Sequence, residues 1–341
     1  MKAAIYTPYL DTLGGGERYV LSVAKILSDS GWSVYLESQD DKILNKVNER
    51  FSLNLSGVKL VKSINRGDGF DLCFWLSDGS IPTLSARKNI LHFQRPFYKV
   101  GGKSLLNRAK FFRINKVVVN SKFTKEWTDR EYPVESFVLY PPVDVSKLKS
   151  KKKENLILYI GRFSQLEQSK GQDILIEAFK NFYDNFDKSW KLVLAGGSEV
   201  GRTDYTENLY QMSTGYPIEI KENVSFSTIK DLYGKAKIFW SAAGYGIDQK
   251  LHPEKLEHFG MTAVESMAAG CVPILFKAGG HTETVENEIN GYLWENPSEL
   301  VIKTSKISKD PGLLRSIGAK AKETAQNYSY EKFKQNLLSL V

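Results

Sequence analysis

The sequence predicts an α/β protein with two parallel sheets, one in each half of the chain. Short apolar runs alternate with segments whose apolar residues recur every three or four positions, which is typical of parallel strands joined by helices. A length of 341 residues fits two domains that each bury a core. A polar, proline-containing stretch at residues 140–153 separates the two series of strands.

In the first half, apolar runs predict strands at residues 3–6, 33–37, 72–76, 88–93 and 116–120. Between the first two, residues 19–27 have helical periodicity, and Gly31 follows as the expected helix stop. In the second half, we expect strands at 156–160, 191–195, 238–241 and 272–276, and helices at 172–186, 228–235 and 261–269. Residues 1–148 and 149–324 are therefore predicted as domains, and 325–341 as a helix that returns to the first domain.

Composition narrows the class of protein. With 42% hydrophobic and 25% charged residues, the chain is neither disordered nor a disulfide scaffold. Cys73 and Cys271 each lie in an apolar run, which favours buried thiols in a reducing compartment. The N-terminus lacks the apolar core of a signal peptide, and no long apolar run occurs, so we expect a cytoplasmic protein.

The net charge of +8 lies in the first 150 residues, which hold 23 basic and 15 acidic side chains against 24 of each in the remainder. Residues 103–116 place apolar side chains on one side of a helix and basic ones around it. The apolar residues are Leu105, Leu106, Ala109 and Phe112, and the basic ones are Lys103, Arg108, Lys110, Arg113 and Lys116. This pattern predicts a face for an anionic membrane surface or an anionic acceptor, or an ordinary helix packed on its own sheet. Nucleic acid is not expected, since no nucleic-acid module is recognisable.

Two glycine and cation patterns indicate phosphate binding. Gly14, Gly15 and Gly16 follow the first strand and open a helix, where backbone N–H groups favour a phosphate, although a tight turn gives the same pattern. Arg162 ends the strand at 156–160, and Lys170 precedes the helix at 172–186. Two cations so placed can hold a diphosphate, or can be solvated side chains.

The third pattern is a pair of glutamates, Glu257 and Glu265, with seven residues between them. Gly260 permits a sharp entry into a short helix, and Glu265 lies one turn inside it. A carboxylate there needs hydrogen-bond donors, and ribose hydroxyls are suitable ones. The alternative is that two surface glutamates flank a core helix.

Together these motifs resemble retaining glycosyltransferases of family 4. They have the GT-B fold, two Rossmann-like domains with parallel sheets facing across a cleft. Besides the three patterns, the resemblance rests on residues 120–124, 140–144, 279–283 and 290–293. Residues 252–260 further resemble the subgroup that includes lipid-linked-oligosaccharide mannosyltransferases.

The resemblance implies a first domain on the acceptor side and a second that binds a nucleotide diphosphate sugar. It implies transfer of a hexosyl unit to a saccharide or lipid-linked acceptor, with same-face attack and no cofactor or metal. Arg162 and Lys170 would hold the diphosphate, Glu257 the sugar and Glu265 the ribose, while His92 matches a catalytic histidine or is a satisfied core residue. The remaining expected donor contacts are Gly15, Gly16, His258, Phe259, Gly260, Met261 and Thr262.

Two departures from the family pattern stand out. Seven residues separate Arg162 from Lys170, which is longer than the usual spacing, and Thr282 stands where the family often has proline. The competing hypotheses are a non-catalytic subunit that supports a partner enzyme, and a nucleotide-sugar epimerase. The presence of Arg162, Lys170, Glu257 and Glu265 favours the transferase over a non-catalytic subunit. We expect it in the cytoplasm or at the inner face of a membrane.

Overall fold

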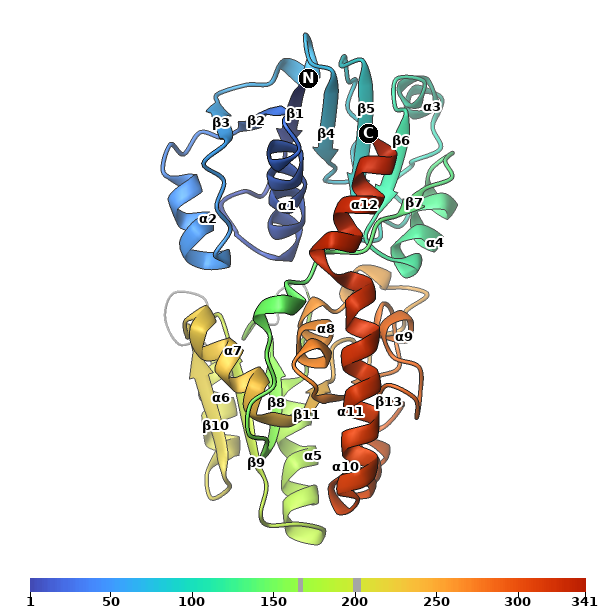
Figure 1. The fold of residues 1–341 in the computed structure, drawn as a ribbon. Coiled ribbons are helices and arrows are strands. Elements are labelled where there is room, and N and C mark those ends of the chain that lie inside the picture. Colours follow the sequence, from blue (N-terminus) through green and yellow to red (C-terminus); the bar gives the residue numbers. More distant parts are fainter. Residues whose placement is uncertain (165–167, 199–203) are drawn as a thin grey trace. The chain divides into compact units, whose positions relative to one another are not determined.

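The computed structural model describes residues 1–164, 168–198 and 204–341 (Figure 1). The chain divides into two compact units, Met1–Pro142 with Glu331–Val341, and Val143–Tyr330. The boundaries predicted from the sequence, after residues 148 and 324, each lie six residues from those of the structure, after residues 142 and 330. The C-terminal helix α12 (Tyr330–Leu340) brings Phe333 against Tyr19, with ring centroids 5.3 Å apart, and both rings belong to the first unit.

The first unit is built on a seven-stranded parallel sheet in the order β3-β2-β1-β4-β5-β6-β7. The five predicted strands are confirmed, and two short ones, β3 and β7, are additional. The strands are β1 (Lys2–Tyr6), β2 (Ser33–Glu37), β3 (Val58–Val61), β4 (Leu72–Leu76), β5 (Lys88–Phe93), β6 (Lys116–Val119) and β7 (Phe137–Val138). The helices are α1 (Gly15–Asp29), α2 (Ile43–Phe51), α3 (Leu105–Phe111) and α4 (Lys122–Glu131).

The described residues of the second unit form a six-stranded parallel sheet in the order β10-β9-β8-β11-β12-β13. The four predicted strands are confirmed, with β10 and β13 added at the edges. The strands are β8 (Glu154–Ile160), β9 (Lys191–Gly196), β10 (Ile218–Glu222), β11 (Ala236–Ser241), β12 (Val272–Phe276) and β13 (Tyr292–Trp294). The helices are α5 (Gln172–Asn185), α6 (Asp204–Ser213), α7 (Phe226–Lys235), α8 (Met261–Ala268), α9 (His281–Thr284), α10 (Pro297–Lys309) and α11 (Pro311–Ala325).

Both sheets have buried central strands because their sequences are apolar on both faces. Every residue of β12 before Phe276 is buried, and in β4 only Trp75 is partly exposed. This is the pattern of parallel sheets covered by helices on both faces. Such a sheet places its ligands beyond the carboxyl ends of the strands. The confirmed architecture is therefore the two-domain α/β fold that the sequence predicts.

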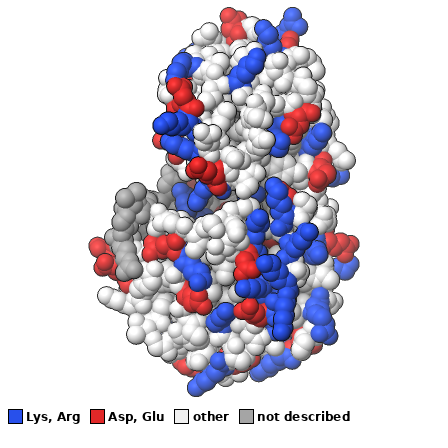
Figure 2. Space-filling model, turned by 60° about the vertical axis from the view of Figure 1, so that its left-hand side comes forward, with Lys and Arg blue, Asp and Glu red and all other residues white. Residues whose placement is uncertain are grey.

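Basic side chains gather around the N-terminal part of the second unit. The run 147–153 belongs to this unit, where Lys151 pairs with Asp231 of α7 at 2.7 Å. A groove of about 290 Å³ beside α7 is lined by Lys147, Lys149, Lys151, Ser227, Lys230 and Asp231. Lys and Arg side chains also gather on the second unit in the face drawn in Figure 2. The lysine run at 147–153 is visible in the sequence, and the structure shows that it forms a local basic cluster with residues of α7 although the second unit as a whole carries no net charge.

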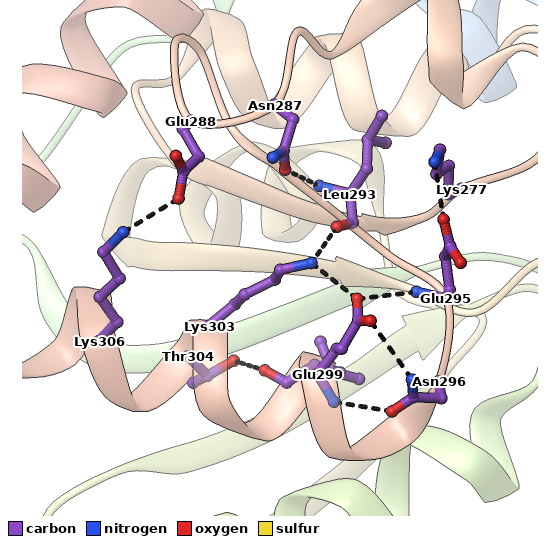
Figure 3. A network of polar contacts seen from close by, with 11 residues as sticks. Lys277, Asn287, Glu288, Leu293, Glu295, Asn296, Glu299, Lys303, Thr304 and Lys306 are labelled. Atoms are coloured by element: carbon purple, nitrogen blue, oxygen red, sulfur yellow. Dashed lines mark hydrogen bonds and ion pairs between the residues drawn. The ribbon is translucent and has the colours of Figure 1, made fainter.

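The edge of the second sheet is fixed by polar contacts between β13 and α10 (Figure 3). Asn296 caps α10 by accepting the Glu299 N–H, as expected for an asparagine at this position. Lys303 donates to the Leu293 carbonyl and to Glu299, which also accepts from the Glu295 N–H. The short strand β13 is therefore held by side chains of the following helix as well as by its ladder to β12.

Within the described residues, no helix combines the length and apolar character needed to cross a membrane.

Candidate active site

In the second unit, a partly buried ion pair joins two of the predicted site residues, Lys170 and Glu257. Lys170 Nζ lies 2.9 Å from Glu257 Oε2, and the two side chains are 12% and 22% exposed. Burial raises the pKa of Glu257, but the charges of Lys170 and His281 outweigh it and lower this pKa to about 2. Glu257 is therefore ionised at neutral pH, and the pair presents one ammonium and one carboxylate at the same place.

Gln168 holds this pair in position. Its Oε1 accepts from Lys170 Nζ at 3.0 Å, and its Nε2 donates to the carbonyl of Leu256 at 2.6 Å. The same amide nitrogen lies 3.1 Å from Nε2 of His258. Gln168 thus links Lys170, which lies shortly before α5, to the loop that carries Glu257. It belongs to no motif of the sequence, so sequence reasoning misses it.

Two glycines let a second loop pack tightly on Glu257. The Gly280 N–H donates to the Glu257 carbonyl at 2.8 Å. A Cβ at Gly279 would lie 2.3 Å from the Glu257 carbonyl oxygen, and one at Gly280 would lie 2.4 Å from Cα of Phe259. The Gly-Gly motif at 279–280 is therefore a requirement for close backbone approach. Thr282, the departure from the family pattern, donates its hydroxyl to the Gly279 carbonyl and closes the same turn.

The helix α8 begins directly after this loop and carries Glu265. Gly260, at φ +92°, makes the sharp entry, with Met261 and Thr262 half-buried in the first turn. Glu265 is 4% exposed, and its Oε2 accepts from the Tyr233 hydroxyl at 3.0 Å. This contact with α7 is a second feature that the sequence does not reveal. Phe259 is 2% exposed with its ring 5.2 Å from that of Tyr328, and its predicted donor contact stays a prediction.

Arg162 follows β8 and is exposed, while its carbonyl accepts from the buried Gln172 side chain at 2.8 Å. Burial raises the pKa of Tyr159 well above its ordinary value, and the negative charge of Glu257 raises it further, whereas the positive charge of Arg162 lowers it. Both charges thus act on the same hydroxyl. The unusual spacing between Arg162 and Lys170 includes residues 165–167, which lie outside the described residues.

In the first unit, His92 is fully buried on β5. Its Nδ1 lies 3.0 Å from the Val118 carbonyl and its Nε2 2.6 Å from Gln94 Oε1, and the ring stacks on Tyr19 at 4.2 Å. Burial lowers the pKa of His92 to about 4, although both hydrogen bonds raise it. The imidazole is therefore neutral at pH 7. A reaction role for His92 stays a prediction, and the structure shows the environment of a satisfied core histidine.

The glycine turn of the first unit lies beside this histidine. Gly15 is exposed in the first turn of α1, and a Cβ at Gly16 would lie 3.2 Å from Cγ of Gln94, the partner of His92. Glu17 accepts from the Gly14 N–H at 2.7 Å and so satisfies one donor of the helix start. The predicted phosphate contact of Gly15 and Gly16 stays a prediction.

Metal-ligating side chains do not cluster in the part of the chain that the structure describes: no group of three or more His, Cys, Asp or Glu could hold an ion there. Cys73 and Cys271 are both buried free thiols.

Comparison with known proteins identifies the family. Residues 142–324, more than half of the chain, match glycosyl transferases group 1. The chain belongs to the family of group 1 glycosyl transferases. An uncharacterized glycosyltransferase of Methanocaldococcus jannaschii is 26% identical, over 96% of this chain and 93% of its own. The alpha-1,3/1,6-mannosyltransferase ALG2 of Dictyostelium discoideum is also 26% identical, over 73% of this chain and 59% of its own.

Solved structures share the fold of this glycosyltransferase. Anabaena HepE in complex with UDP superposes with a TM-score of 0.76 at 19% identity, covering 99% of this chain and 98% of that one. A sucrose-phosphate synthase of Thermosynechococcus elongatus gives a TM-score of 0.73 at 17% identity, over 100% and 98% of the two chains. The GT-B architecture and the assignment as a glycosyltransferase are thus confirmed, whereas the roles of single residues stay predictions.

Proposed function

We propose that this glycosyltransferase moves a hexosyl unit from a nucleotide diphosphate sugar to a saccharide or lipid-linked acceptor, with retention of anomeric configuration. The observation that carries the proposal is the Lys170–Glu257 pair, held by Gln168 at the carboxyl edge of the second sheet. The UDP complex of HepE supports a UDP-linked donor, and a relative named GDP-Man:Man(3)GlcNAc(2)-PP-Dol alpha-1,2-mannosyltransferase, from Dictyostelium discoideum, supports a GDP-linked one.

In the proposed mechanism, Lys170 and the exposed Arg162 neutralise the diphosphate that leaves the sugar. Charge-assisted hydrogen bonds of this kind are stronger than neutral ones, and they act where negative charge develops in the transition state. Two cations, together with N–H groups at the start of α8, replace a metal ion in this role. The acceptor hydroxyl attacks from the face that the diphosphate leaves, and a phosphate oxygen takes its proton.

The carboxylates have separate proposed roles. Glu257, ionised beside Lys170, accepts hydrogen bonds from sugar hydroxyls, and Glu265 accepts from the ribose while Tyr233 fixes its orientation. Carboxyl oxygens accept hydrogen bonds, so hydroxyls are the natural partners of both. We further propose that the first unit supplies the acceptor side.

The test is turnover with a panel of UDP- and GDP-hexoses, with the anomeric configuration of the product read by NMR. We expect one donor to be consumed with retention, undiminished by a chelator. Glu265→Ala should lower kcat/KM by at least tenfold, since it removes a ribose acceptor. The exposed Glu323→Ala, which loses only a surface pair with Lys320, is the matched control. An inverted product, or equal turnover by Glu265→Ala, would contradict the proposal.

A further inference from the structure

Residues 99–113 form an exposed surface that is both apolar and basic, here called the 99–113 segment. Leu105 is 85%, Leu106 67% and Phe112 91% exposed, and no residue of α3 is buried. The segment contains Lys99, Lys103, Arg108, Lys110 and Arg113 and no acidic residue. The alternative of a helix packed on its sheet through this apolar side is therefore wrong. Large apolar side chains exposed to this extent in one place mark an interaction site.

The 99–113 segment is held in shape by its own unit. The Glu131 carboxylate accepts N–H groups from Lys99, Val100 and Gly102 at 3.0 to 3.1 Å. Ser104 caps α3, and Phe111 packs against the buried cluster that contains Phe93 and Tyr132. The helix is thus attached by one side while its exposed apolar side chains point elsewhere. A surface ordered in advance loses little conformational entropy on binding.

We propose that the 99–113 segment docks on the surface of an anionic lipid bilayer. Leu105, Leu106 and Phe112 would enter the boundary between headgroups and acyl chains, and the surrounding cations would meet lipid phosphates. Charge complementarity selects this occupant. The segment has five basic side chains and no acidic one, and the carboxylate of Glu131 beside it accepts backbone N–H groups of the segment, so the excess of positive charge suits a uniformly negative surface. A protein partner with a mixed surface would leave several of these cations without a carboxylate.

The lysine groove beside α7 makes a useful contrast. Lys149 lines this groove, and Lys152 belongs to the same run, 147–153, which has five lysines and no acidic residue. The large exposed apolar residues of the described chain do not include any from 143–153 or α7. Charge without apolar anchors gives weak, salt-sensitive attraction only. Substitutions in the lysine run 147–153 therefore control for charge, and exposed isoleucines of the second unit control for apolar character.

The test is flotation with vesicles of neutral phosphatidylcholine, and with the same lipid containing about a third phosphatidylserine. We expect the full chain to float only with the anionic vesicles. Leu106→Ser with Phe112→Ser should lower the bound fraction at least tenfold, since both side chains leave the lipid. Lys103→Gln with Arg108→Gln should lower it about fivefold for each charge.

The matched controls are Lys149→Gln with Lys152→Gln, and Ile289→Ser with Ile302→Ser, which should float as the unaltered chain does. Equal recovery with both vesicles, no flotation at all, or equal losses in the controls would overturn the proposal. Thermal unfolding shows whether each variant is folded. Binding of UDP and GDP by the same variants, measured by calorimetry, should be unchanged, so failure of the docking proposal is distinguishable from failure of the proposed donor site.

Discussion

Gly279 shows how the absence of a side chain shapes the loop that carries Glu257. It combines a positive φ of +52° with a Cβ position only 2.3 Å from the Glu257 carbonyl oxygen. The sequence identifies this glycine as part of a motif, but only the structure shows which backbone it approaches. Gln168 and Tyr233, in contrast, belong to no motif that the sequence reveals. The structure shows that Gln168 contacts Lys170 and that Tyr233 contacts Glu265.

Gly279→Ala should therefore be strongly destabilising. Overpacking against rigid backbone costs about 1–3 kcal/mol, in addition to the strain of a positive φ. Gly215→Ala is the matched control, because Gly215 has φ +83° with nothing within 4 Å of its Cβ position. We expect the free energy of unfolding, measured in urea, to fall further for Gly279→Ala. Equal losses would show that no close approach exists.

Among the elements, buried strands are predictable and edge strands are not. The apolar runs at 72–76 and 272–276 can only be buried, whereas β10 alternates apolar with charged residues and β7 has two residues. Short edge strands are defined by their neighbours, and a local pattern cannot contain that information. Neighbours also decide the orientation of α3. Its sequence is amphipathic, but the sequence alone does not show which side of the helix contacts the sheet.

Lys153 joins the ends of two helices of the second unit. Its Nζ donates to the carbonyls of Ala236, after α7, and Ala269, after α8, at 2.7 and 2.8 Å. Lysine near helix C-termini satisfies carbonyls that have no partner in the helix. Burial lowers the pKa of Lys153, chiefly by desolvation.

Lys153→Met should lower the free energy of unfolding by about 2–3 kcal/mol, because the buried carbonyls lose a charged donor. Lys152→Met, at an exposed neighbouring position, should change it by less than about 0.5 kcal/mol. Chemical denaturation of both variants measures the difference. A Lys153→Met variant as stable as the unaltered chain would exclude the bridging role.

On the scale of the whole molecule, the two units differ in net charge. The first unit carries 23 basic and 15 acidic side chains, and the second carries 24 of each. The net charge therefore favours an anionic partner for the first unit, consistent with docking by the 99–113 segment. Stability at acidic pH depends instead on buried groups such as His92.

The chain should lose stability as the pH falls from 6.5 towards 4. The pKa of His92 is about 4 in the folded chain and 6.5 when exposed, so the unfolded chain binds more protons in this window. The loss reaches about 3 kcal/mol at its limit, and His281, whose pKa burial also lowers, adds to it. His92→Gln should flatten the dependence of unfolding free energy on pH. An unchanged slope in this variant would contradict the buried, neutral state of His92.

The central claim is that Lys170 holds the diphosphate of the donor. The most direct test is calorimetric titration of the unaltered chain and of Lys170→Ala with UDP, GDP, ADP and dTDP, with Lys306→Ala as the control for a surface lysine paired with Glu288. We predict that a nucleoside diphosphate binds the unaltered chain and Lys306→Ala equally, and binds Lys170→Ala at least tenfold more weakly. Equal affinity for Lys170→Ala, or no binding of any of the four nucleotides, would contradict the claim.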